Sequence, residues 1–194
     1  MTDKTEPFTI NGVQLIALAV CAATEKMRYD ISCVRLRPTA DKKGTVLEAT
    51  DGRILARLNL DTTPAPGDYA FPLALVKRFK ADDVIEVEKG VATIRDLMMR
   101  VDLLPPGAYP TTDDVIPAAT REGSPVIGAG EPFGQAFAVL KKLGVDGCRF
   151  GIGKPNEAVL ITASTLYGRL EIAVMPLDSE DEATKKRLAE TVAK

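Results

Sequence analysis

The sequence predicts an α+β fold of repeated strand–helix–strand–strand–strand units, in which antiparallel sheets carry helices on one face. Two observations support this prediction. The same order of elements recurs about three times, roughly every 55 to 65 residues, although the residues themselves do not repeat. Short turns also link the predicted strands, and turn-linked strands form antiparallel sheets that pack helices on one face.

The first unit begins with a helical pattern over residues 12–28. Its apolar residues recur at helical spacing after Asn11, which is a good N-cap residue. Three strand patterns follow, at residues 31–37, 44–49 and 54–60. The turn Thr50-Asp51-Gly52 separates the last two, as Asp-Gly turns do in hairpins.

The second and third units repeat this order. In the second, a short extended run at 69–71 precedes a helix that Pro72 opens, since proline suits a first helical turn. Its strand patterns lie at residues 84–88, 91–95 and 98–104. In the third, a helix over 132–143 ends before Gly144. The strand patterns after it lie at residues 148–152, 158–162 and 170–175.

These units predict one complete domain and half of another. The complete domain takes residues 1–117 and holds two units. Residues 118–130 form the linker, within a stretch rich in Pro, Gly, Ala and Thr. Residues 131–177 form the half domain, and the tail at 178–194 is expected to be a short helix or disordered.

Composition excludes several classes of function. The chain of 194 residues has no histidine, which removes Ser-His-Asp catalysis and histidine-ligated metal sites. Three widely spaced cysteines argue against a zinc site or a disulfide framework, and we expect buried free thiols and no cofactor. The N-terminus is polar and unlike a signal peptide, and the longest apolar stretch, at 12–24, is too short to span a membrane. We therefore expect a cytoplasmic protein.

Two short segments superficially suggest an enzyme. Residues 151–155 resemble a phosphate-binding loop, but Pro155 stands where that loop needs Ser or Thr. The pair Asp113-Asp114 suggests acid–base chemistry, but adjacent side chains on an extended segment point apart, and a solvated loop explains them. The expected protein is not an enzyme.

Basic residues gather near the C-terminal end of each predicted helix. They are Lys26 and Arg28, then Lys77, Arg78 and Lys80, then Lys141 and Lys142. Cations there complement the helix dipole, which is the ordinary structural explanation of each cluster. If all three helices share one concave face, the clusters instead form a positive lining that suits sequence-independent contact with DNA phosphates. The net charge of −2 means that such contact depends on local clustering.

Four segments resemble bacterial DNA polymerase III beta-type sliding clamps. Residues 27–34, 47–56 and 109–117 match an Arg-Tyr segment, an Ala-Thr-Asp-Gly turn and a Pro-containing boundary of the clamp's middle domain. Residues 172–177 match the clamp's C-terminal Val-Met-Pro ending. The resemblance spans about residues 10–177. It implies a DNA-clamp fold, with antiparallel sheets outside and helices on the inner face. Arg53 stands where clamps usually have histidine.

The resemblance implies a processivity factor that encircles duplex DNA and tethers a polymerase, and possibly a clamp loader, through short peptides. The matched partner-peptide pocket consists of Ile31, Thr50, Gly52, Leu55, Pro110, Val115, Met175, Pro176 and Leu177. Clamps close as rings of twelve units, so a chain of about three units predicts a homo-tetramer, joined at exposed sheet edges. The alternative is a clamp-derived interaction module, a decoy or a regulator that binds another clamp, which does not encircle DNA.

Overall fold

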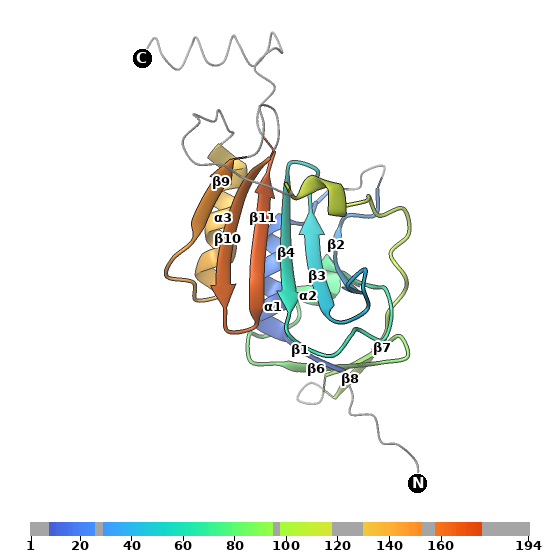
Figure 1. The fold of residues 1–194 in the computed structure, drawn as a ribbon. Coiled ribbons are helices and arrows are strands. Elements are labelled where there is room, and N and C mark those ends of the chain that lie inside the picture. Colours follow the sequence, from blue (N-terminus) through green and yellow to red (C-terminus); the bar gives the residue numbers. More distant parts are fainter. Residues whose placement is uncertain (1–7, 26–28, 95–97, 118–129, 153–157, 176–194) are drawn as a thin grey trace, which may run out of the picture.

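The fold consists of two antiparallel sheets and a layer of helices (Figure 1). The computed structural model describes residues 8–25, 29–94, 98–117, 130–152 and 158–175. Its strands are β1 (Phe8–Asn11), β2 (Cys33–Pro38), β3 (Thr45–Thr50), β4 (Ile54–Leu60), β5 (Tyr69–Pro72), β6 (Val84–Glu88), β7 (Val91–Ile94), β8 (Met99–Asp102), β9 (Arg149–Ile152), β10 (Val159–Thr165) and β11 (Gly168–Val174). Its helices are α1 (Gly12–Leu18), α2 (Leu73–Val76) and α3 (Gly130–Lys142), with 3-10 turns η1 (Ala19–Cys21) and η2 (Asp113–Val115).

The larger sheet joins the first and third units of the sequence. Its order is β5-β2-β3-β4-β11-β10-β9, so it also contains β5, the first strand of the second unit. The other three strands of the second unit pair with β1 in a separate sheet of order β1-β6-β7-β8. The last strands of two units, β4 and β11, pair antiparallel from Ile54 opposite Val174 to Leu60 opposite Gly168. Gly168 is required there: its φ is +136°, and a Cβ at this position would collide with the carbonyl oxygen of Asn59. The third unit therefore continues the sheet of the first unit.

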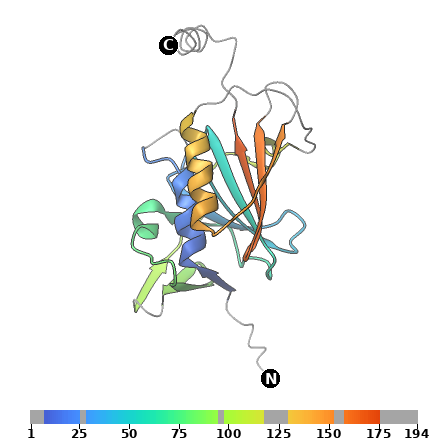
Figure 2. The same ribbon diagram turned by 90° about the vertical axis from the view of Figure 1, so that its left-hand side faces the viewer.

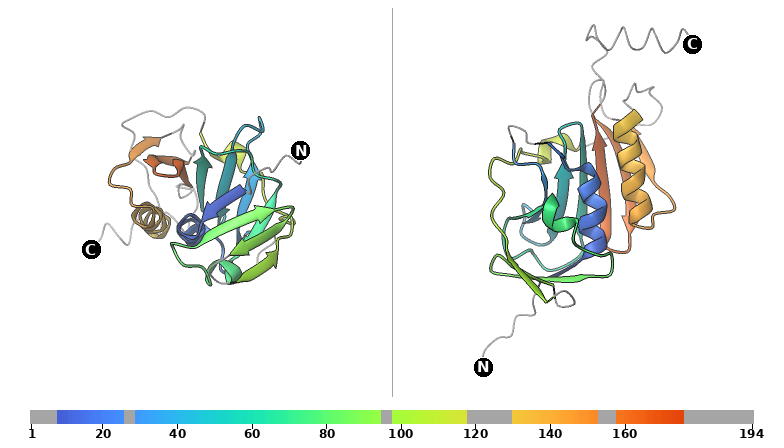
Figure 3. Two further views of the ribbon diagram at one scale, coloured as in Figure 1. Left: turned by 90° about the horizontal axis from the view of Figure 1, so that it is seen from below. Right: turned by 180° about the vertical axis from the view of Figure 1, so that it is seen from behind.

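The helices share one face of the larger sheet. Figure 2 shows α1 and α3 side by side against it, and the right-hand view of Figure 3 shows α2 beside α1 on the same face. The main apolar core lies between helices and sheets. Its fully buried members include Leu15, Leu18, Leu58, Phe71 and Ile85. The opposite face of the larger sheet is the outer face, and residues 109–116, after β8, cross it.

Two helices are shorter than the sequence predicts. The helix expected over 12–28 ends with η1 at Cys21, because Ala22 is extended and the N–H of Ala23 donates to the carbonyl of Ile31. The helix that Pro72 opens is a single turn, although Phe79 beyond it is still buried. Apolar periodicity marks residues that enter the core, and these residues do so outside regular helix.

The third helix begins within the predicted linker. α3 starts at Gly130, the last residue of that linker, and the other linker residues, 118–129, lie outside the described residues. The tail at 178–194 also lies outside them.

Candidate functional site

The turn between β3 and β4 has the hairpin geometry expected from Thr50-Asp51-Gly52. The Thr50 hydroxyl accepts a hydrogen bond from the N–H of Gly52 (3.0 Å) and donates to the carbonyl of Ile54 (2.7 Å). A carboxylate oxygen of Asp51 accepts from the N–H groups of Arg53 (2.8 Å) and Ile54 (3.1 Å). Gly52 has a φ of +90°, which explains the glycine. The turn is thus fixed by its own side chains.

A small apolar cluster, separate from the main core, lies on the outer face beside this turn. Its buried members are Leu55 of β4, Ala158 before β10 and Ala173 of β11. Val115 and Ile116, from the segment that crosses the outer face, pack against these three side chains. We call these five residues the outer apolar cluster. Three parts of the chain that are distant in sequence meet in it, because β4 pairs with β11 and the crossing segment passes over both.

Polar contacts hold the crossing segment to the sheet. The fully buried carboxylate of Glu48 on β3 accepts hydrogen bonds from Arg35, Arg37 and Arg57 and from the hydroxyl of Thr112 (2.8 Å). Arg57 also donates to the Thr112 hydroxyl, at 2.8 Å. Buried charges are tolerated when they are paired and hydrogen-bonded, as these are. We call Glu48, the three arginines and Thr112 the arginine–glutamate network.

Two further residues of the crossing segment bind the same arginines. The carboxylate of Asp113 pairs with Arg37 at 2.6 Å and with Arg57 at 2.9 Å. Burial raises the pKa of Asp113, but the hydrogen bond and charge of Arg37 and the charge of Arg57 outweigh it, so its pKa lies below the usual value. The ring of Tyr109 lies 5.0 Å from the guanidinium carbon of Arg35, a cation–π contact. The network thus extends along the crossing segment and positions Val115 for the apolar cluster.

The predicted pocket residues occupy several places. Leu55 and Val115 belong to the outer apolar cluster, and Thr50 and Gly52 form the adjacent turn. Met175 is 40% exposed, and its N–H donates to the carbonyl of Arg53, which places it beside that turn. Pro110 is half-buried on the crossing segment, and Ile31 is buried but is not a member of the cluster. Pro176 and Leu177 lie outside the described residues.

The predicted DNA-contacting residues that the structure describes are exposed. Lys77, Arg78 and Lys80 follow α2, and Lys141 and Lys142 form the last turn of α3. Their helices lie on the same face of the larger sheet (Figure 3). Lys26 and Arg28 lie outside the described residues. α1, which lies between the other two helices, has no charged residue of its own.

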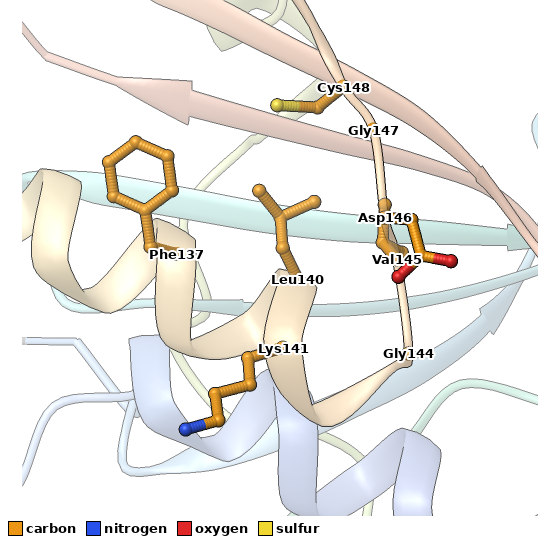
Figure 4. A pocket seen from close by; sticks show the side chains of 8 residues that line it. All are labelled: Phe137, Leu140, Lys141, Gly144, Val145, Asp146, Gly147 and Cys148. Carbon is orange, nitrogen blue, oxygen red and sulfur yellow. The ribbon is translucent and has the colours of Figure 1, made fainter.

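A cavity of about 380 Å³ opens at the end of α3 (Figure 4). Phe137, Leu140 and Lys141 of the helix line it, together with residues 144–148 of the loop before β9. Phe137 is 51% exposed and Phe150 of β9 is 49% exposed, with their ring centroids 6.3 Å apart. This edge of the molecule therefore presents apolar side chains to solvent.

The cysteines are free, as the sequence predicts. Burial raises the pKa of Cys21 to about 12 and that of Cys33 to about 11, whereas Cys148 is half-buried. Among the described residues, no group of three or more Cys, Asp or Glu side chains is placed to hold a metal ion. No helix in the described part of the chain is long and apolar enough to cross a membrane.

Sequence reasoning missed the arginine–glutamate network. Arg35 and Arg37 alternate with apolar residues in one predicted strand, and Glu48 and Arg57 stand in the next two. Opposite charges on neighbouring strands are a signal for cross-strand pairs. Asp113 was expected in a solvated loop, but it is paired with two arginines.

No protein-family model and no curated protein matches the chain. Solved structures of bacterial clamps do. DNA polymerase III subunit beta from Borrelia burgdorferi aligns with a TM-score of 0.65 and 10% identity, over 92% of this chain and 66% of that one. The beta subunit from Streptococcus pyogenes aligns with a TM-score of 0.64 and 14% identity, over 91% of this chain and 67% of that one. The Helicobacter pylori beta clamp bound to a DNA ligase peptide aligns with a TM-score of 0.62 and 13% identity, over 91% of this chain and 68% of that one.

The similarity covers nearly all of this chain and about two thirds of the length of each clamp. At 10–14% identity it concerns the fold. It agrees with the sheet order and the helix layer described above, and with the motifs at residues 47–56 and 109–117. The chain therefore has the fold of the bacterial DNA polymerase III beta sliding clamps, with a divergent sequence.

Proposed function

We propose that the protein is a processivity factor of the sliding-clamp type, which acts without catalysis in the cytoplasm. It encircles duplex DNA as a homo-oligomer and tethers a DNA polymerase through a short peptide bound beside the outer apolar cluster. The observation that supports this most is that cluster. It joins two halves of a continuous sheet to the segment that crosses them, and it lies beside the Thr-Asp-Gly turn that resembles the clamp motif.

Peptide binding fits the chemistry of this surface. Leu55, Ala158 and Ala173 supply a buried apolar floor, and exposed Met175 offers an apolar side chain at its margin. Short peptides bind where a few apolar anchors meet a preformed apolar site. A solved H. pylori clamp of the same fold is bound to a DNA ligase peptide, which makes that peptide a suitable probe.

The test is fluorescence polarisation with a labelled DNA ligase peptide. Met175→Asp places a charge at the margin, and we expect it to weaken binding about tenfold or more. Leu166→Asp is the matched control, because Leu166 is 94% exposed at the opposite end of β11. Equal binding by wild type and Met175→Asp, with both variants folded, would contradict the proposed peptide site.

DNA contact is proposed for the exposed basic residues after α2 and at the end of α3. Reversing the charges of Lys77, Arg78 and Lys80 should shorten retention on circular DNA, and higher salt should shorten it further. A control variant reverses three exposed lysines in strand turns, Lys42, Lys43 and Lys89. If both variants lose retention equally, net charge accounts for binding and the proposed inner face is wrong.

Ring formation is proposed from the ends of the two sheets. β9 ends the larger sheet, and β8 ends the smaller one, where Ala70 of β5 bridges to Leu104 just beyond the strand. In the first unit, residues that lie opposite one another on β2, β3 and β4 are Leu36, Leu47 and Leu58. In the third unit, the residues in the equivalent places on β9, β10 and β11 are Phe150, Ile161 and Ile172. Leu36 is fully buried because β5 pairs with β2, whereas Phe150, without such a neighbouring strand, is 49% exposed. Unit counting gives a homo-tetramer, which light scattering measures directly.

One observation favours the alternative, an interaction module that does not encircle DNA. α1 has no charged side chain to offer to DNA on the face of the sheet that carries the helices. A positive lining for DNA therefore depends on the basic residues near the ends of the other helices. A protein that binds the DNA ligase peptide but stays monomeric, and leaves circular DNA as fast as linear DNA, would establish this alternative over the ring.

A further inference from the structure

A second cavity, of about 720 Å³, opens on the third unit, where β9, β10 and β11 lie side by side (Figure 1). The polar side chains that line it are Arg149, Thr162, Ser164 and Arg169. Thr162 lies opposite Arg149 on the neighbouring strand. Ser164 lies opposite Arg169. Residues that alternate with them, such as Ile161, pack in the main core on the helix side. These four side chains therefore belong to the outer face, and we call this site the arginine cavity.

The arginine cavity has hydrogen-bond donors to spare for an anion. Arg149 forms no ion pair with the described residues of the chain. Arg169 pairs with one carboxylate oxygen of Glu171 at 3.0 Å, and Asn59 donates to the other oxygen at 2.9 Å. A guanidinium has five N–H donors, so both arginines can bind a further carboxylate. The two hydroxyls of the cavity also form no hydrogen bond within the part of the chain that the structure describes.

The other arginines of the outer face are already paired with acidic residues. The arginine–glutamate network joins three of them to Glu48, and Asp68 and Asp113 add two further carboxylates. Arg53, in the turn beside the outer apolar cluster, also forms ion pairs with two carboxylates. An additional acidic group on this face is consequently attracted more strongly to the arginine cavity than to these arginines.

The chain carries an acidic segment that begins close to this face. Residues 178–182 read Asp-Ser-Glu-Asp-Glu, and no other five consecutive residues of the sequence include four acids. The segment follows Met175, whose N–H donates to the carbonyl of Arg53 and which stands at the end of β11 beside the outer apolar cluster. The acidic segment itself lies outside the described residues.

The length of the chain after Met175 is sufficient to reach the arginine cavity. Arg169 lies six residues before Met175 on β11, and Arg149 lies two strands away, level with the residue four before Met175. At about 3.4 Å per residue and about 4.8 Å per strand, the two arginines lie about 20 and 17 Å from Met175. An extended chain spans about 3.3 Å per residue, so the first and last residues of the acidic segment reach about 10 and 23 Å. Both arginines fall within this range.

We propose that the acidic segment 178–182 docks in the arginine cavity of its own chain, where Arg149 and Arg169 bind its carboxylates. Exposed ion pairs are individually weak, but the covalent tether supplies a millimolar effective concentration and several acids share the site. To reach the cavity, the chain passes over Ala173, a member of the outer apolar cluster. The docked segment therefore competes with a partner peptide. Only this competition rests on the proposed function; the docking does not.

A nitroxide placed just after the acidic segment measures docking in the full-length chain. Ala183→Cys carries the label and Cys148→Ser removes the accessible thiol, while Cys21 and Cys33 are buried and stay unlabelled. We expect an electron paramagnetic resonance spectrum with an immobilised component at about 50 mM salt, which about 0.5 M salt removes because it screens exposed charges. The immobilised component should be independent of protein concentration, since the contact is within one chain.

Charge reversal of the two arginines is the decisive variant. Arg149→Glu with Arg169→Glu should lower the ratio of docked to free segment about tenfold or more, because the attractive contacts become repulsive. The matched control reverses Lys42 and Lys43, which are exposed in another turn, and should leave the spectrum unchanged. Docking should return when the arginine variant also carries Asp178→Lys, Glu180→Lys, Asp181→Lys and Glu182→Lys. Circular dichroism checks that each variant is folded.

Three results would overturn the docking. They are a fully mobile nitroxide in the wild-type background at low salt, an equal immobilised component after reversal of the arginines, and an equal loss in the lysine control. Immobilisation that grows with protein concentration would place the segment on a second copy and overturn docking within one chain.

Peptide binding tests the competition separately. Neutralising the acidic segment by Asp178→Asn, Glu180→Gln, Asp181→Asn and Glu182→Gln should tighten binding of the labelled DNA ligase peptide about 2- to 10-fold, as a docked fraction of about 50 to 90% would require. Equal affinities would overturn the competition. If neither chain binds the peptide, the proposed peptide site fails, while the nitroxide spectra still decide whether the segment docks.

Discussion

Replacing Glu48 with glutamine tests whether the arginine–glutamate network positions the crossing segment. The substitution keeps the size of the side chain and removes the charge that three arginines share. Removing one partner of a buried ion pair costs about 3–5 kcal/mol, because the other charge stays buried. Arg35 keeps both bonds to Asp68, and Arg37 and Arg57 keep Asp113. We therefore expect Glu48→Gln to lower the free energy of unfolding by about 3 kcal/mol, the low end of that range.

The assay is reversible thermal and urea unfolding of the whole chain. For a chain of this length, about 3 kcal/mol corresponds to a fall in Tm of about 6–12 °C. Asp68→Asn is the matched control: it removes a partner of Arg35 whose side chain is 41% exposed, and it should cost less than about 1 kcal/mol. A loss below about 1 kcal/mol for Glu48→Gln would refute the assignment of the network as the anchor of the crossing segment.

Two further predictions follow from the pKa values. The pKa of Asp113 is lowered in the fold, so its contribution to stability is present above its unfolded pKa and is lost as pH falls through the folded value. Wild type should consequently lose more stability than Asp113→Asn when pH is lowered from about 5 to 3, measured by urea unfolding at each pH; equal losses would contradict the pairing with Arg37. Burial and the raised pKa values of Cys21 and Cys33 should protect both thiols at pH 8. Ellman's reagent should then label Cys148 alone in the native chain, all three cysteines in denaturant, and none rapidly in native Cys148→Ser.

Local signals in the sequence account for much of the fold. Strand and turn positions follow from apolar runs bounded by turn residues, and the Thr50-Asp51-Gly52 turn has the expected geometry. Helix lengths were less predictable. The apolar periodicity over 12–28 continues past the end of η1, because residues that enter the core need not remain helical.

The candidate site is less accessible from sequence. Leu55 and Val115 were named from their resemblance to clamp motifs, and the fold brings both into one cluster. Ala158 and Ala173 of the same cluster carry no signal of their own, because alanine in or beside a strand is common wherever small side chains pack. In the sequence, Glu48 is a single acidic residue in an apolar strand. Its neighbours in the sequence do not indicate that three arginines bind it.

The sequence by itself determined the order of strands and helices, the absence of histidine chemistry and the turn that shapes the candidate site. These depend on side-chain type and on spacing over a few residues, and both can be taken from the sequence without knowing long-range contacts. Only the tertiary structure decided that β4 pairs with β11, that the crossing segment is anchored to Glu48 and that β9 ends the larger sheet. Each of these depends on contacts between residues distant in the chain, and their energies arise from burial and pairing that no local pattern records.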